Sequence, residues 1–176
     1  MSRDFRQGNR PGQGGSTQGP TPTFAVDRDG VRKVIAKDDP KALVDLTDKY
    51  GKQLADARLA TSQIRSIFGS VRQMESRWYD DNQRNQGIRD LLMLKPKLAY
   101  QEVRHKPQRR EDPNPVGMLR AMLEPAIDAV IDPGEDHNTE EDGDNQKRFR
   151  RFMEYFEALL AYHKAYGGAD KAQAGR

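Results

Sequence analysis

The apolar residues of this chain recur at the spacing of an α-helix, and this periodicity restricts the chain to a helical fold. The clearest run lies between Thr61 and Trp78, where large apolar side chains recur every three or four residues: Ile64, Ile67, Phe68, Val71, Met74 and Trp78. Because a helix repeats every 3.6 residues, this spacing places them on one face about four turns long. Patterns typical of β-strands are nearly absent, and at most a short extended segment is expected within residues 24–35. The sequence therefore predicts an all-α fold.

Local signals divide the chain into helices. Asp39 and Pro40 are typical of a helix start, because Asp caps free N–H groups and Pro suits the first helical position. That helix is expected to reach about Arg58, and Thr61 or Ser62 caps the next one. Further helical spacing covers 88–94, 98–103, 116–130 and 149–163, with an interruption at Pro96, a kink at Pro125 and an end at Gly167. We expect a single compact bundle of about five helices over residues 24–167.

Both ends of the chain have the composition of disordered tails. Residues 1–23 contain five Gly and three Pro, with Phe5 as the only large apolar residue after Met1, and residues 168–176 resemble them. No apolar run approaches the length of a membrane span, and the N-terminus lacks a secretory pattern. We therefore expect a cytoplasmic chain with no membrane partner.

The net charge of +3 conceals blocks of opposite sign. Residues 61–110 contain eleven basic and five acidic side chains, whereas 111–144 contain one basic and eleven acidic side chains. Four basic residues, at 147, 148, 150 and 151, open the last helix. Such asymmetry indicates a polyanionic partner rather than a particular fold.

No motif in the chain points to catalysis. There is no Cys, and His105, His137 and His163 lack partners at the spacing of metal ligands. We expect His163 to lie in the core or at a helix end. The acidic run 135–144 does not follow the calcium-loop pattern, and no phosphate-binding glycine loop, nucleophile elbow or acid–base pair is present. We therefore expect a protein that is not an enzyme, with no catalytic residue, no metal site and no cofactor.

The helix from Thr61 to Trp78 also carries a polar stripe, formed by Ser62, Arg65, Gly69, Arg72 and Ser76. Small residues allow a sugar–phosphate backbone to approach closely, and each guanidinium can bind one phosphate. Ser62 and Gln63 lie at the helix N-terminus, where free N–H groups favour an anion. The alternative interpretation is a set of capping residues followed by a solvated face.

A helix-turn-helix DNA-binding motif is a further alternative. Leu54-Ala55 and Thr61-Ser62-Gln63 resemble the middle of that motif. In this register, however, Leu59 occupies the tight-turn position of Gly, and Arg65 occupies a buried aliphatic position. Both residues disfavour the DNA-binding interpretation.

Three separated segments resemble one known family. They are Leu59-Ala60-Thr61-Ser62-Gln63-Ile64-Arg65-Ser66-Ile67-Phe68, then Leu94-Lys95-Pro96-Lys97-Leu98-Ala99-Tyr100 with Arg104, and the closing run from Phe152 to Gly167. Together they are similar to the small subunit of type III-A CRISPR–Cas (Csm) effector complexes. The chain has Ala60 where the family usually shows Thr, which removes one hydroxyl.

The resemblance implies a non-catalytic helical bundle that acts in antiviral defence. Copies of it would stack along the guide RNA filament, contact other subunits of the effector, and hold guide and target RNA through the backbone. The matching RNA-binding candidates are Ser62, Gln63, Arg65, Lys97 and Arg104, and the helical-face argument adds Arg72. A purely structural spacer, which holds neighbouring subunits while RNA is bound elsewhere, remains the alternative function.

Overall fold

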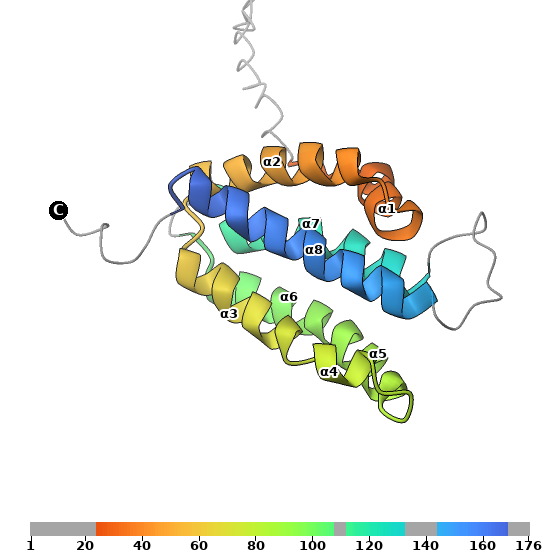
Figure 1. Cartoon of the computed structure of the whole chain (residues 1–176). Helices are drawn as coiled ribbons and strands as arrows, with labels where there is room; N and C mark the ends of the chain where they lie inside the picture. Colours follow the sequence, from red (N-terminus) through yellow and green to blue (C-terminus); the bar gives the residue numbers. More distant parts are fainter. Residues whose placement is uncertain (1–23, 108–111, 133–143, 169–176) are drawn as a thin grey trace, which may run out of the picture.

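The computed structural model describes residues 24–107, 112–132 and 144–168, and within these ranges it contains helices and no strands (Figure 1). The helices are α1 (Arg28–Lys37), α2 (Pro40–Asp56), α3 (Thr61–Arg72), α4 (Glu75–Trp78), α5 (Arg84–Leu92), α6 (Leu94–Arg104), α7 (Pro115–Ile131) and α8 (Asp144–Ala165). The predicted all-α fold is confirmed, with more helices than expected. The predicted tail 1–23, most of the tail 168–176 and nearly all of the acidic segment 133–144 lie outside the described residues.

Helix α8 occupies the centre of the fold and packs against α2, α7, α1 and α3. Helix α2 lies along α8, while α7 lies behind α8 in the view of Figure 1. Helix α3 packs on α8, whereas α6 packs on α7. Helices α3 and α6 therefore lie side by side on one flank of the α7–α8 pair, and they line a common groove.

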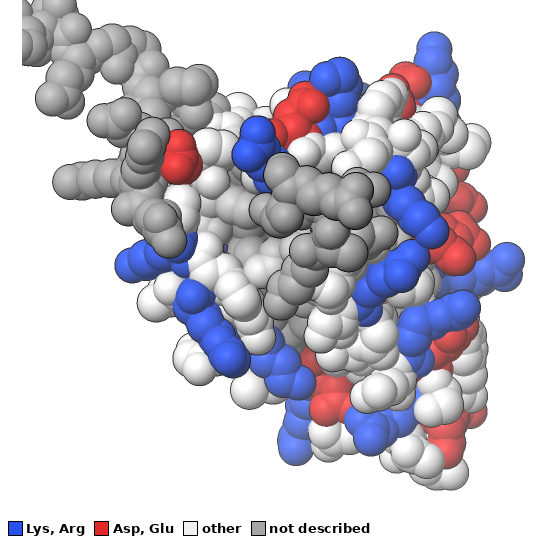
Figure 2. Space-filling model, turned by 90° about the vertical axis from the view of Figure 1, so that its left-hand side faces the viewer, with Lys and Arg blue, Asp and Glu red and all other residues white. Residues whose placement is uncertain are grey.

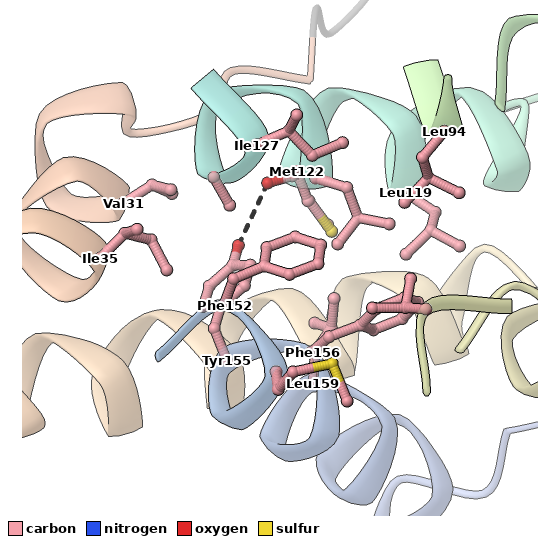
Figure 3. Close-up of a cluster of buried hydrophobic side chains, with 14 of the residues drawn as sticks. Val31, Ile35, Leu94, Leu119, Met122, Ile127, Phe152, Tyr155, Phe156 and Leu159 are labelled. Carbon is pink, nitrogen blue, oxygen red and sulfur yellow. Dashed lines mark hydrogen bonds between the residues drawn. The ribbon is translucent and has the colours of Figure 1, made fainter. Parts of the chain in front are cut away.

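Aromatic and aliphatic side chains of α7 and α8 form the centre of the core, with contributions from α1 and α6 (Figure 3). The side chains labelled there are nearly or completely buried: Val31, Ile35, Leu94, Leu119, Met122, Ile127, Phe152, Tyr155, Phe156 and Leu159. The Tyr155 hydroxyl donates a hydrogen bond of 3.4 Å to the backbone carbonyl of Met122. Burial raises the pKa of Tyr155 well above its ordinary value, so the phenol stays neutral inside the core.

Helices α2 and α8 approach each other closely at Gly51. A Cβ atom added there would lie 2.5 Å from the Cβ of Tyr162 and 2.8 Å from the backbone nitrogen of His163. Only a residue without a side chain fits between the two backbones at this distance. The contact therefore requires glycine because of the space available.

The C-terminal end of α8 holds the start of α3. The fully buried His163 ring binds the backbone carbonyl of Leu59 through Nε2 at 2.9 Å. The Thr61 hydroxyl donates to the carbonyl of Gly168 at 3.0 Å. The predicted position of His163, in the core or at a helix end, is thus confirmed, and these contacts anchor the first turn of α3.

The extended piece predicted for residues 24–35 is wrong, because this segment contains most of α1. The Asp27 carboxylate accepts a hydrogen bond of 2.8 Å from the Gly30 N–H and caps the helix. Val31, Val34 and Ile35 recur at helical spacing and are buried. Burial of this apolar face against α7 and α8 outweighs the strand preference of these β-branched residues.

The single helix predicted for residues 61–78 is also interrupted. Helix α3 ends at Arg72, where the Met74 N–H bonds the Val71 carbonyl three residues back rather than four. The short α4 then places Trp78 face to face with Phe149 of α8, with ring centres 4.4 Å apart. The break keeps Trp78 buried, and it moves Ser76 out of the α3 stripe.

Both prolines lie within helices, and the interruption predicted at Pro96 is displaced. Pro96 is the third residue of α6, where the missing N–H removes none of the regular helical bonds. Helix α7 continues from Pro115 to Ile131 through Pro125, which is buried. The interruption near Pro96 lies instead at Met93, between α5 and α6.

We predict that Gly51→Ala lowers the free energy of unfolding by about 1–3 kcal/mol, because the added methyl group overpacks the α2–α8 contact. Gly69→Ala is the matched control: no atom lies within 4 Å of its added Cβ, and alanine favours the helix by up to about 1 kcal/mol. Urea denaturation of both variants measures the difference. Equal stabilities would contradict the close approach at Gly51.

Candidate nucleic-acid interface

Two adjoining hollows between α3 and α6 form one surface groove. One hollow has a volume of about 340 Å³ and the other about 250 Å³, and they share Ser66, Ile67 and Gln101. The remaining lining residues are Ser62, Gln63, Ser70, Met93, Leu94, Pro96, Lys97, Leu98, Tyr100, Arg104, His105 and Val116. We call this surface the α3–α6 groove.

The local sequence explains why polar side chains line the α3 wall. The buried Ile64 and Val71 turn one face of α3 inward, which leaves Ser62, Ser66 and Ser70 on the outer part of the wall. At the first turn, the Gln63 side-chain oxygen accepts the Ala60 N–H at 3.2 Å. Its amide nitrogen carries two N–H donors, and Gln63 is one of the residues that line the groove.

Four of the six predicted RNA-binding residues line the groove. Ser62 and Gln63 come from α3, and Lys97 and Arg104 come from α6. Lys97 and Arg104 are seven residues apart, which corresponds to two helical turns and about 10 Å along the axis. The structure thus brings together residues from two segments that are distant in the sequence.

The other two predicted residues, Arg65 and Arg72, lie on a different side of α3. Both are exposed, and neither lines the groove. The Arg72 guanidinium lies 5.8 Å from the centre of the Phe68 ring and pairs with Glu75 at 3.4 Å. Phe68 in turn packs edge-on against Phe156 of α8, so these two arginines follow the α8 side of the helix.

Among the described residues that line the groove, none is Asp or Glu. The acidic residue of α6, Glu102, instead pairs with Arg120 of α7 at 2.8 Å. Lys95 likewise pairs with Asp128 of α7. The α7 side of α6 is therefore neutralised, while Lys97 and Arg104 leave the groove cationic.

The surface as a whole is not uniformly basic. On the face shown in Figure 2, Lys and Arg side chains form separate groups with acidic side chains between some of them. A polyanion would therefore meet local cationic sites rather than a continuous basic face. The α3–α6 groove is distinguished as such a site because its lining, as far as the structure describes it, contains Lys97 and Arg104 and no acidic side chain.

A model of the Csm2 Type III-A family matches residues 37–169. The chain belongs to the Csm2 Type III-A family. This confirms the resemblance seen in the three sequence segments and makes the chain a small subunit of a type III-A Csm complex. Comparisons with curated proteins and with solved structures found no match.

The Csm2 match covers both walls of the groove. It extends from the last residue of α1 through α8 and includes all six predicted RNA-binding residues. Most of α1 precedes the matched region, although α1 is an integral part of the core. The groove therefore lies within the part of the chain that defines the family.

Sequence reasoning missed several groove residues of this Csm2-family chain. Ser66, Gln101, Tyr100 and His105 line the groove but were not among the candidates. Tyr100 and Gln101 each lie three or four residues from Lys97 and Arg104, so helical spacing over residues 94–104 places them near these two cations. Ser66 and His105 required knowledge of which helix lies opposite.

The helix-turn-helix alternative does not describe how these helices pack. Helices α2 and α3 each pack on α8 rather than forming a pair. In the connection between α2 and α3, the residue with a positive φ is Arg58, at 60°, and not Leu59, which occupies the tight-turn position in the motif's register. Leu59 is fully buried instead. Arg65, which that motif would bury, is exposed.

Two of the four basic residues that open α8 have a structural role. Arg148 is buried and donates from Nε to the Val130 carbonyl at 3.0 Å. Arg151 donates to the carbonyls of Ile35 and Ala36, each at 3.2 Å, and so satisfies the C-terminal end of α1. By contrast, Arg150 is exposed and pairs with Glu154 at 3.1 Å.

Within residues 24–107, 112–132 and 144–168, no group of three His, Cys, Asp or Glu side chains could hold a metal ion. In the same ranges, no helix has the length and apolar character needed to cross a membrane.

We expect Arg151→Met to lower the free energy of unfolding by about 1–3 kcal/mol, because it leaves buried carbonyls of α1 without their donor. Arg150→Met is the control, since 73% of the Arg150 side chain is exposed, against 18% for Arg151. Urea denaturation compares the two. A loss of stability as large in Arg150→Met would refute the capping role of Arg151.

Proposed function

We propose that this Csm2-family chain binds the RNA backbone without sequence specificity, and that the α3–α6 groove makes the contact. In this proposal the subunit is non-catalytic and cytoplasmic. It holds guide and target RNA within the type III-A complex during antiviral defence, beside other subunits and further copies of itself. The supporting observation is that Ser62, Gln63, Lys97 and Arg104 line one groove in which none of the described lining residues is acidic.

The groove offers the donors that a sugar–phosphate backbone needs. The Arg104 guanidinium can bind a phosphate through two parallel hydrogen bonds, and the Lys97 ammonium binds as a point charge. Ser62 and Gln63 supply neutral donors suited to phosphate oxygens and 2′-hydroxyl groups. Because pairing with a guide RNA reads the sequence, such a subunit needs no contact specific to one base.

Arg65 and Arg72 provide a second RNA contact in this proposal. Of the two, Arg72 forms an ion pair with Glu75. Because this pair is exposed, its contribution to the stability of the fold is small. A phosphate can replace Glu75 at little cost. Since the two arginines lie outside the groove, their contribution to RNA binding can be measured separately.

We predict that Lys97→Gln with Arg104→Gln weakens retention of target RNA by the assembled complex. Loss of two phosphate contacts should reduce the slope of log K against log salt by about 1.4 to 1.8. Filter binding at a series of salt concentrations measures this slope. Lys41→Gln with Arg150→Gln is the control, because it removes one exposed Lys and one exposed Arg that do not line the groove.

An unchanged salt slope in the groove variant, together with an assembled complex, would refute the assignment of Lys97 and Arg104. A slope that falls equally in the control variant would show that any loss of positive charge has this effect. Either result would remove the groove from the proposal.

For Arg65→Gln with Arg72→Gln, we predict a separate decrease in the salt slope of about 1.4 to 1.8. Because these residues share no partner with Lys97 and Arg104, the effects of the two double variants should add. Filter binding of the quadruple variant tests this additivity. No change in the slope would assign the two arginines to protein contacts or to solvent.

A structural spacer remains the second candidate function, favoured by large apolar side chains at the surface. Val44 of α2 and Tyr79 after α4 are each 51% exposed. Apolar surface of this kind suits contact with neighbouring subunits. If the chain is only a spacer, Val44→Ser should impair assembly in native mass spectrometry, while the groove variant retains its target RNA.

A further inference from the structure

Tyr100 is the most exposed of the large apolar side chains in the described residues, at 63%. It lies on α6 within the groove lining, three residues after Lys97 and four residues before Arg104. Side chains three and four residues apart are neighbours on a helix surface. The phenol ring therefore lies between the two groove cations, one helical turn from each.

We propose that Tyr100 stacks with an unpaired base of the RNA whose backbone lies in the α3–α6 groove. This inference rests on the proposed function, and it adds a contact to the base itself. An aromatic ring between two cations can hold a nucleotide at both ends, with the base on the ring and the phosphate on Lys97 or Arg104. Gln101, which lines both hollows, adds an amide to the groove lining.

Stacking is compatible with binding that ignores sequence. Every base has a π face, so an aromatic side chain accepts any of the four. Combined with cationic grooves, such rings are a common means of holding single-stranded nucleic acid. Tyr100 would therefore increase affinity without selecting the target, which is the requirement when a guide RNA already reads the sequence.

The surroundings of Tyr100 favour RNA over a protein partner. The neighbouring Met93 and Val103 are also exposed, at 54% and 60%, and such side chains alone would equally suit an apolar protein surface. The ring, however, lies between two cations, and the lining of this groove contains no acidic side chain within the described part of the chain. This charge is complementary to a polyanion and is costly to cover with an apolar partner.

Tyr100→Leu and Tyr100→Phe form the matched pair for the test. Leucine keeps an apolar side chain but removes the ring, whereas phenylalanine keeps the ring and removes only the hydroxyl. Since the side chain is exposed, both variants should fold, and their urea midpoints verify this. Val103→Ala is the control for loss of a neighbouring exposed apolar group.

The experiment uses the assembled type III-A complex and target RNAs that carry 2-aminopurine at successive single positions. The emission of this base falls when it stacks. We expect the wild-type and Tyr100→Phe complexes to quench at least one position, and Tyr100→Leu to lose that quenching. Affinity for target RNA should fall about 5- to 150-fold in Tyr100→Leu, with an unchanged salt slope because no phosphate contact is lost.

Several results would overturn the stacking proposal while leaving the proposed function intact. They are wild-type affinity in Tyr100→Leu, no quenching at any position in the wild-type complex, or an equal loss of affinity in Val103→Ala. Failure of Tyr100→Leu to assemble, seen by native mass spectrometry, would instead make Tyr100 a protein contact. The proposed function fails on a different measurement, the salt slope of the Lys97 and Arg104 variant.

Discussion

The close packing of α2 on α8 at Gly51 is the constraint on which the rest of the structure depends. It places α8 at the centre, with its remaining faces available to α1, α3 and α7. The same end of α8 binds the start of α3 through His163 and Gly168. Because α3 is fixed to α8 and α6 is fixed to α7, the groove between them is held by the core rather than by loops.

The chemistry of the groove follows from which side of α6 faces inward. Glu102 and Lys95 point to α7 and are paired there, so the opposite side of the helix is left with Lys97, Tyr100 and Arg104. Ion pairing within the fold thus separates the charges of one short helix. The result is a cationic wall facing the polar wall of α3, in a chain of the Csm2 Type III-A family.

Block charge along the chain is a poor guide to where a polyanion would bind. Several cations of the basic block 61–110 already pair with acidic side chains of the same chain at the surface, such as Arg77 with Asp90 and Arg84 with Asp81. In the run that opens α8, Arg148 and Arg151 satisfy backbone carbonyls. Only the folded arrangement separates these structural cations from those free to meet a ligand.

The sequence by itself determined the all-α class and the buried faces of α3 and α8, because helical periodicity specifies which side chains must leave water. Its resemblance in three separate segments also identified the Csm2 Type III-A family. It did not determine α1, whose apolar face is stabilised by α7 and α8, or the break after Arg72 that brings Trp78 onto Phe149. The tertiary structure alone decided that Ser62 and Gln63 share a groove with Lys97 and Arg104, apart from Arg65 and Arg72. Periodicity defines a face of a helix, but only packing decides which helix lies opposite it.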